Sequence, residues 1–350
     1  MSSHASRLIV PVLGFGLIVA FASSYYLLGV LAEPLAAGTG TTPSLVFAGL
    51  SGAFLISAGL SPFGGRWVDR RGGREVLTVA SVVFAVGLAG LGLSQGPVGV
   101  VAAILTMGVG MGVGFYGPAF AILVVVHGED AKKRSTAVSL SGAFGGALGW
   151  PMTLVMIAAV GWRVAFFVWA ALHLLVCLPL YLTLLPNEPG GPRPSSNGGR
   201  VRWDGRMIRL AVLFAGAWWI ATAMSAHLPR LLGRLGLEPA QAALAASLTA
   251  GAAVAYLGGK GLAGAVALGQ GAGNGLLSVA SGVLPLHLFG QDNYATRQAL
   301  ILTPARFLQA AAPLSYGVLL DRSAGLALLT SSLVCVLMFA MTFGLERREQ

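Results

Sequence analysis

Residues 65–74 read Gly-Arg-Trp-Val-Asp-Arg-Arg-Gly-Gly-Arg, and they separate two long stretches that contain no charged side chain. The stretch before covers residues 34–65 and the stretch after covers residues 76–128, whereas a helix that crosses a bilayer needs only about 20 mostly apolar residues. Arginines alone would orient such a segment in a membrane, so the lone Asp69 and the glycines at fixed offsets must serve something more. The stretch therefore predicts a specialised connection between two membrane spans.

The composition of the whole chain agrees with membrane insertion. Of the 350 residues, 56% are hydrophobic and 10% are charged, whereas soluble chains carry about 25% charged residues. This composition excludes an ordinary soluble domain and a disordered chain. The net charge of +10 does not indicate a nucleic-acid partner, because the basic residues lie in short segments between apolar stretches. Cys177 and Cys335 are far apart within apolar runs and form neither a disulfide framework nor a metal-ligand pattern.

Stretches without Asp, Glu, Lys or Arg predict the membrane spans. The first half contains five of them, and residues 76–128 break at Ser94-Gln95-Gly96-Pro97 into two spans, which makes six. The second half contains five more, of which residues 307–320 reach spanning length only if the helix starts upstream and tolerates Arg306. We thus expect about eleven spans, drawn from residues 8–32, 34–65, 76–128, 135–162, 164–187, 210–229, 239–259, 261–291, 307–320 and 323–345.

A Pro/Gly/Ser-rich segment at residues 187–206 divides the chain and predicts a linker between two helix bundles, residues 1–186 and 207–350. Thirteen lysines and arginines lie on the side of the N-terminus and linker, against the single Arg163 on the other side of the first six spans. The positive-inside rule therefore places the N-terminus and the linker in the cytoplasm. The apolar run 8–32 exceeds the roughly 7–15 residues of a signal-peptide core, so we interpret it as the first span.

These features together resemble the major facilitator superfamily of secondary transporters. The decapeptide at 65–74 is similar to that family's cytoplasmic loop signature G-x-L-a-D-r-x-G-r-k, with Trp67 in place of Leu and Gly73 in place of Arg. The resemblance implies an all-α fold of two six-helix bundles that exposes a central site to each side of the membrane in turn. It also implies that the loop is a conformational latch made by Gly65, Asp69, Arg70, Gly72 and Arg74. The alternative is a basic loop that only fixes orientation.

A second motif lies in the fifth expected span, where Gly142, Gly146 and Gly149 line one helical face. Small residues at such spacing allow close helix packing. The segment also resembles the Gly/Pro motif of the superfamily's antiporters, with Ala147 at the position of a proline. Plain packing and an antiporter motif both remain open. Gly161-Trp162-Arg163 is similar to the family's turn between the fifth and sixth spans.

Candidate substrate-binding residues are polar or aromatic side chains at expected mid-span positions: Tyr25, Tyr26, Tyr116, Trp218, Asn274, Arg306 and Gln309. If the helix begins near Gln298, Arg306 lies about 12 Å deep and shares a face with Gln309. The alternative starts the helix at Thr303-Pro304, which makes Arg306 an interfacial side chain that reaches water. His173 is the clearest ionisable group at depth in the first half, and we interpret it as a structural residue rather than a proton carrier.

The second half is 42 residues shorter than the first, and the loss falls near residues 256–261. We therefore expect a ninth span to be reduced or missing. We expect a plasma-membrane protein of the bacterial inner-membrane type, monomeric and without cofactor, that exports a small organic solute or drug-like compound. A transport-inactive product of internal deletion and an uptake carrier for organic anions are the alternatives. A membrane enzyme is disfavoured because no nucleophile–base pair or metal-spaced cluster is found in the loops.

Overall fold

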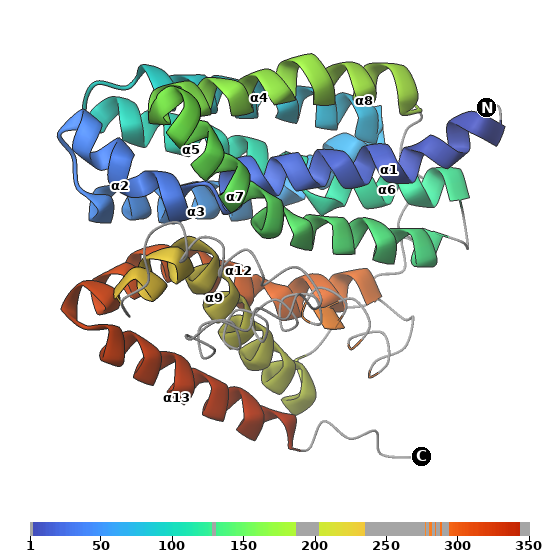
Figure 1. The fold of residues 1–350 in the computed structure, drawn as a ribbon. Helices are drawn as coiled ribbons and strands as arrows, with labels where there is room; N and C mark the ends of the chain where they lie inside the picture. Colours follow the sequence, from blue (N-terminus) through green and yellow to red (C-terminus); the bar gives the residue numbers. More distant parts are fainter. Residues whose placement is uncertain are drawn as a thin grey trace, which may run out of the picture.

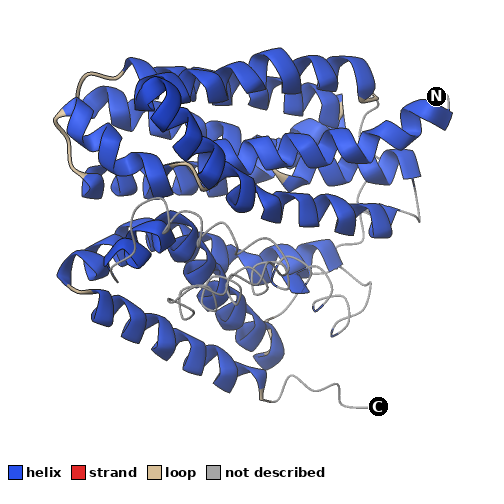
Figure 2. Ribbon diagram, viewed as in Figure 1, coloured by secondary structure: helices blue, strands red, loops and turns tan. Residues whose placement is uncertain are grey.

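The computed structural model describes residues 3–127, 131–186, 203–234, 277, 280–281, 284, 288 and 294–343. Helices and short connections make up these residues, with no strand among them (Figure 2). They form two groups that face each other across a junction (Figure 1). The upper group, the N-terminal bundle, ends at Leu184, and the lower group, the C-terminal helices, begins at Gly205. The expected all-α fold is confirmed.

The N-terminal bundle carries the helical segments expected of the first half. Its last long apolar stretch, Thr136–Leu184, is interrupted at Gly161, where a φ of +80° breaks the helical geometry and makes two helices of one. Six expected spans thus have a helical counterpart. The elements are α1 (Ser3–Ala20), η1 (Phe21–Tyr25), α2 (Leu28–Thr39), α3 (Pro43–Arg71), α4 (Gly73–Leu93), α5 (Pro97–Gly114), α6 (Tyr116–His127), α7 (Ala131–Leu172), η3 (His173–Cys177) and α8 (Leu178–Leu184).

The C-terminal helices are α9 (Gly205–Arg234), α12 (Tyr294–Arg322) and α13 (Ala324–Thr342). Within the described residues, seven helical stretches are long and apolar enough to cross a membrane, two of them in this half. Helix α12 is not one of the seven; its sequence includes Arg297 and Arg306 and the prolines 304 and 313. The linker at 187–202 and nearly all of residues 239–291 lie outside the described residues. The count of eleven spans and the shortened second half therefore stay predictions.

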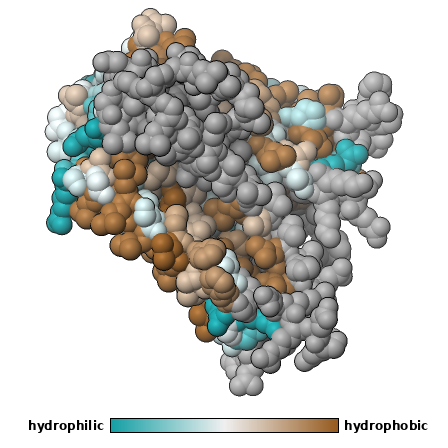
Figure 3. All heavy atoms as spheres, turned by 60° about the horizontal axis from the view of Figure 1, so that its bottom comes forward, coloured by the Kyte–Doolittle hydropathy of each residue, from teal (hydrophilic) through white to brown (hydrophobic). Residues whose placement is uncertain are grey.

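A continuous apolar core joins the two groups. It contains the inner faces of the N-terminal bundle together with side chains of α9 and α12 such as Trp219, Leu228 and Tyr316. The outer faces remain apolar too, as on α13, where Leu333 and Phe339 are 62% and 67% exposed. Brown, hydrophobic atoms cover much of the described surface in Figure 3. Such a surface is stable in a membrane, because lipid chains solvate exposed apolar side chains that water would not.

The decapeptide at 65–74 is less of a loop than the sequence indicated. Helix α3 continues to Arg71, and Gly72 alone connects it to α4, which begins at Gly73. Gly72 adopts a φ of +87°, a backbone conformation that residues with a Cβ rarely adopt. The chain therefore reverses between two spans at a single residue, and most of the motif forms the last turns of α3.

Candidate functional site

Two helices of the N-terminal bundle are broken at the same level. The first span changes from α-helix to the π-helical turn η1 at Phe21–Tyr25, and the fourth span breaks at Phe115 between α5 and α6. The two breaks meet, because the rings of Phe21 and Phe115 stack with centroids 4.2 Å apart. Irregular backbone at membrane depth is tolerated only where protein or a cavity surrounds it, and π-turns are frequent at functional sites. This level of the bundle is therefore the candidate position of a binding site.

The glycines of the fifth span bring α7 against η1. A Cβ on Gly146 would lie 2.9 Å from the Tyr26 ring, and one on Gly149 would lie 2.8 Å from Ala22 Cβ and 3.0 Å from its Cα. A Cβ on Gly142 would collide with the Tyr116 hydroxyl. The glycines thus permit a contact between backbones that larger residues would prevent. Their geometry accounts for the motif by packing, and it leaves the antiporter interpretation a prediction.

A buried polar cluster lies where η1 meets the C-terminal helices. The Tyr25 hydroxyl is 2.6 Å from Thr222 Oγ1 of α9 and lies near the side chains of Gln309 of α12 and Ser225 of α9. The neighbouring Tyr26 also lies near Ser225, and its carbonyl accepts a hydrogen bond of 2.8 Å from Trp150 Nε1. We call Tyr25, Tyr26, Thr222, Ser225 and Gln309 the central cluster. Its side chains are neutral hydrogen-bonding groups from both halves of the chain.

One turn further along the junction, α12 contains Pro313. Pro313 has no N–H, and two backbone groups beside it are bonded from outside the helix. The Leu314 N–H donates to Ser51 Oγ of α3 at 3.1 Å, and the Pro313 carbonyl lies 2.7 Å from His227 Nε2 of α9. The His227 ring also packs on Phe47 with centroids 4.0 Å apart. Both halves of the chain thus supply partners for the backbone of α12 at Pro313.

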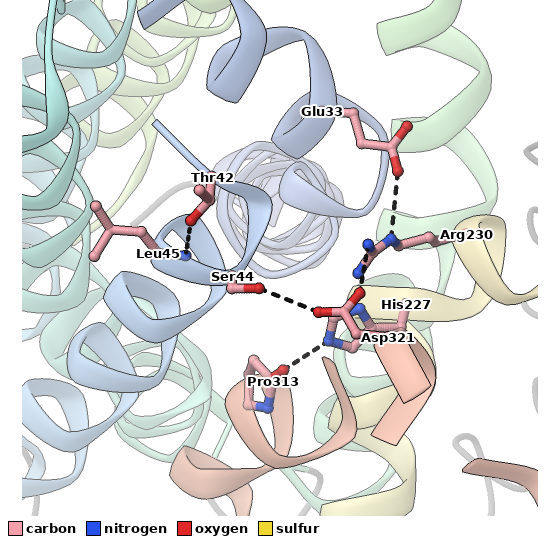
Figure 4. A network of polar contacts seen from close by, with 8 residues as sticks. All are labelled: Glu33, Thr42, Ser44, Leu45, His227, Arg230, Pro313 and Asp321. Carbon is pink, nitrogen blue, oxygen red and sulfur yellow. Dashed lines mark hydrogen bonds and ion pairs between the residues drawn. The ribbon is translucent and has the colours of Figure 1, made fainter. Parts of the chain in front are cut away.

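A group of charged residues lies beyond Pro313, at one end of the junction between the two groups of helices (Figure 4). Arg230 at the end of α9 lies between two acids: its Nη2 is 2.8 Å from Asp321 Oδ1 of α12, and its Nε is 3.3 Å from Glu33 Oε1 of α2. The other Asp321 oxygen accepts a hydrogen bond of 3.2 Å from Ser44 Oγ at the start of α3. We call Glu33, Ser44, Arg230 and Asp321 the ionic layer. It lies at the end of the bundle opposite the N-terminus.

The structure brings some of the predicted substrate residues together and separates others. Tyr25, Tyr26 and Gln309 join the central cluster, and Tyr116 lies beside it, with its ring 5.2 Å from Phe21. Arg306 is exposed and lies one turn before Gln309 on α12. Trp218 packs in a second core between α9 and the start of α12, and it is Trp219 that faces the junction, where its Nε1 donates to Ser315. Asn274 lies outside the described residues.

The predicted latch is anchored within the N-terminal bundle in this structure. Trp67, which replaces the usual Leu, donates from Nε1 to Glu75 Oε1 at 3.1 Å, and Arg71 pairs with the same carboxylate at 3.4 Å. Arg74 donates to the carbonyls of Leu182 and Leu185 at the end of α8. Gly65, Asp69 and Arg70 lie in the last turns of α3, where only the backbone is described. These contacts tie α3, α4 and α8 together at the N-terminal end of the bundle.

The sequence did not predict the hydroxyl partners at the junction or the ionic layer. A partial signal was present, because Glu33, Arg230 and Asp321 each follow an uncharged run. The count of eleven spans puts Glu33 and Arg230 on one side of the membrane but Asp321 on the other, so it could not bring the three together. The partners Ser44, Ser51, Thr222 and Ser225 carry no such signal, since hydroxyls are common in membrane helices. His173 is buried, with Nε2 2.9 Å from Ser23 Oγ of η1 and its ring 5.0 Å from Phe84. Its position is that of a structural residue that supports the π-turn.

Known structures share this architecture across almost the whole chain. A bacterial homolog of the human lysosomal transporter Spinster, in an inward-facing and occupied conformation, aligns with a TM-score of 0.71 and 14% identity, over 91% of this chain and 83% of that one. A mutant of the nucleoside transporter NupG aligns with a TM-score of 0.72 and 12% identity, over 96% and 99%. The same Spinster homolog, inward-facing and unoccupied, gives 0.58 and 15% identity, over 99% and 81%.

At such low identity these similarities establish the fold alone. No match was found among curated proteins. The sequence profile described as Major Facilitator Superfamily, in contrast, matches residues 13–267, well over half of the chain and including the decapeptide and the glycines of α7. The paired bundles, the irregular helices at their junction and this match lead to one conclusion: the chain belongs to the Major Facilitator Superfamily of membrane transporters.

Proposed function

We propose that the protein is a secondary active transporter that exports a small organic solute or drug-like compound by alternating access at the junction of its two bundles. The central cluster carries this proposal, because buried groups from η1 and α9 and the half-buried Gln309 of α12 converge at the level where the helices are broken. Substrate sites of such transporters lie near the bilayer midplane between the two halves and use interrupted helices. The resemblance of the α7 glycines to an antiporter motif supports export.

The decisive experiment is solute flux. A thermal-shift screen of small organic compounds on the purified protein would first identify a ligand. Proteoliposomes would then be tested for movement of that ligand against its gradient when a proton gradient is imposed, with protein-free liposomes as the control. If none of the compounds that stabilise the protein is transported, the proposal is wrong and a transport-inactive membrane protein is favoured.

Arg306 extends the proposed site toward the side of the N-terminus. Its side chain is exposed, shares the face of α12 with Gln309, and lies one turn from the central cluster. No acidic residue lies near it in the sequence, so a ligand, water or a carbonyl group would balance its charge. We propose that Arg306 faces a water-filled cavity and binds an anionic or carbonyl-bearing group of the solute. Arg306 also favours the second candidate function, uptake of organic anions.

We expect an Arg306→Cys variant, made without Cys177 and Cys335, to react readily with a membrane-impermeant thiol reagent and to be protected by the ligand. Arg306→Lys keeps the charge but loses the planar fork of donors, so we expect affinity for the ligand to fall by about tenfold if the contact is bidentate. Gly205→Cys, exposed at the start of α9 with room for a Cβ, serves as the control for protection. Labelling of Arg306→Cys that the ligand does not change would place Arg306 at the membrane interface and contradict the site.

We propose that the N-terminus and the linker are cytoplasmic, from the positive charge of the connections on that side. In this orientation the ionic layer lies at the extracellular end. The polar contacts described between the two groups connect residues 25–51 with α9 and α12 from Thr222 onward, on the extracellular side of Arg306. This distribution supports an inward-facing state, the conformation named for the two Spinster-homolog structures.

A protease site inserted within residues 190–199 should test the orientation. Because Pro/Gly/Ser composition implies no packed contacts, we expect the insertion to leave abundance and flux near the parent level. Protease should cut it in inside-out vesicles and should leave it intact in right-side-out vesicles until detergent is added. Cleavage only from the outer face of sealed right-side-out vesicles would reverse the proposed orientation.

A further inference from the structure

Arg230 is shared between acids that belong to opposite halves of the molecule. It lies at the end of α9, and Asp321, its partner at 2.8 Å, lies at the end of α12 in the same group of helices. Glu33, its partner at 3.3 Å, lies on α2 of the N-terminal bundle. Figure 4 shows the Arg230 guanidinium between the two carboxylates, with Ser44 reaching Asp321 from the start of α3. One cation thus joins three helices across the junction.

These contacts differ in what happens to them when the bundles separate. The pair Arg230–Asp321 lies within the C-terminal helices and moves as a unit. The contacts Arg230–Glu33 and Ser44–Asp321 span the junction, so they must break if that end opens. Helices α2 and α9 touch directly beneath them, because a Cβ on Gly29 would lie 3.2 Å from the carbonyl oxygens of both Ser225 and Ala226. The layer therefore sits on a closed seam between the two halves.

We propose that the ionic layer is the extracellular gate of the transporter, in which the Arg230–Asp321 pair is a preassembled half that captures Glu33 and Ser44 whenever that end closes. This inference rests on the proposed function and orientation. The bond from Leu314 N–H to Ser51 is an inner layer of the same closure, placed between the gate and the central cluster. When the gate opens, the two contacts between the bundles break. Arg230 still has an acidic partner, because it remains paired with Asp321.

The exposure of the charges suits a gate that must open in every cycle. The Glu33 side chain is 67% exposed, whereas that of Arg230 is 14% exposed. An exposed ion pair is weak because water screens it and solvates both partners when they separate, so its loss shifts a conformational equilibrium only about fivefold. Removal of Arg230 has a larger effect, since it leaves Glu33 and Asp321 close to each other with no cation between them. We expect that effect to be about tenfold or more.

The test measures access to the central cluster from the extracellular side. Ser225→Cys is the reporter, because Ser225 is buried in that cluster, its hydroxyl donates to the Ala221 carbonyl of its own helix, and cysteine is close to serine in size. It is made on a background without Cys177 and Cys335 and labelled with a charged, membrane-impermeant maleimide in right-side-out vesicles. We expect Glu33→Gln to raise the labelling rate about fivefold and Arg230→Gln to raise it about tenfold or more.

Two further variants separate a gate from a general loss of packing. Glu33→Asp keeps the carboxylate and is expected to label at a rate closer to that of the parent. Glu75→Gln removes an acid that is paired within the N-terminal bundle alone and is expected to leave the rate unchanged. A parent rate in both Glu33→Gln and Arg230→Gln, or an equal increase in Glu75→Gln, would overturn the gate. Because the labelling needs no substrate, it can succeed or fail independently of the flux experiment.

Discussion

Gly149→Val is expected to lower transport by more than about tenfold and to lower the Tm of the purified protein by several degrees. The new Cβ would lie 2.8 Å from Ala22 Cβ and 3.0 Å from Ala22 Cα, so a rotamer change cannot relieve the collision and α7 must move away from η1. Overpacking of this kind costs about 3 kcal/mol. The displacement would also shift Tyr25 and Tyr26, which follow Ala22 in the same segment of the chain.

Gly59→Val is the matched control for this effect. Gly59 lies in α3, and a Cβ there would meet no atom within 4 Å. The same substitution should therefore leave both the Tm and the flux near the parent values. Thermal stability by size-exclusion chromatography in detergent, together with flux in proteoliposomes, measures the two variants side by side. Parent-like stability and flux in Gly149→Val would show that the close approach of α7 to η1 is not required.

Asp69→Asn is expected to lower transport by about tenfold, with insertion and abundance near normal. The decapeptide places this lone acid among four arginines in the last turns of α3, at the proposed cytoplasmic end. A carboxylate there can bind a basic side chain or the positive end of a neighbouring helix, and asparagine keeps the size while removing the charge. If Asp69 stabilises one state of the cycle, a loss of about 1.4 kcal/mol accounts for the tenfold effect.

Asp204→Asn provides the comparison at the same end of the molecule. Asp204 caps α9, since its Oδ1 accepts a hydrogen bond of 2.7 Å from the Met207 N–H, and asparagine caps helices about as well as aspartate. We therefore expect Asp204→Asn to transport at the parent rate. Initial rates of flux, normalised to the amount of protein inserted, separate the two variants. A parent rate in Asp69→Asn would leave the decapeptide only its role in orientation.

Much of the architecture could be predicted from the sequence because a bilayer imposes simple rules. Uncharged runs of spanning length gave the helices of the first half, since a charge at the centre of a helix is costly in lipid. The break at Ser94-Gln95-Gly96-Pro97 corresponds to the connection between α4 and α5, and Gly161 marks the turn expected within residues 135–187. The decapeptide identified the family, which the match over residues 13–267 confirms.

The extent of the decapeptide's turn was not predictable from its residues. Its charges and glycines are typical of a loop, yet α3 extends through them because Trp67 and Glu75 bond across the two helices and Gly72 alone reverses the chain. The π-turn η1 also carries no local signature. Its residues are ordinary helix formers in lipid, and the extra residue per turn is stabilised from outside by α7 glycines and His173.

The sequence by itself indicated the helical spans of the first half and the family, because hydrophobic length, charge and glycine spacing are local properties. Only the tertiary structure decided which side chains meet at the junction. Tyr25 and Thr222 are 197 positions apart, and Ser44 and Asp321 are 277 apart, so no pattern in either segment specifies the pairing. Trp218 and Trp219 are adjacent in sequence and face different cores, since successive residues on a helix point about 100° apart. Helix rotation and the approach of the two bundles decide these contacts, and both depend on the packing of the whole molecule.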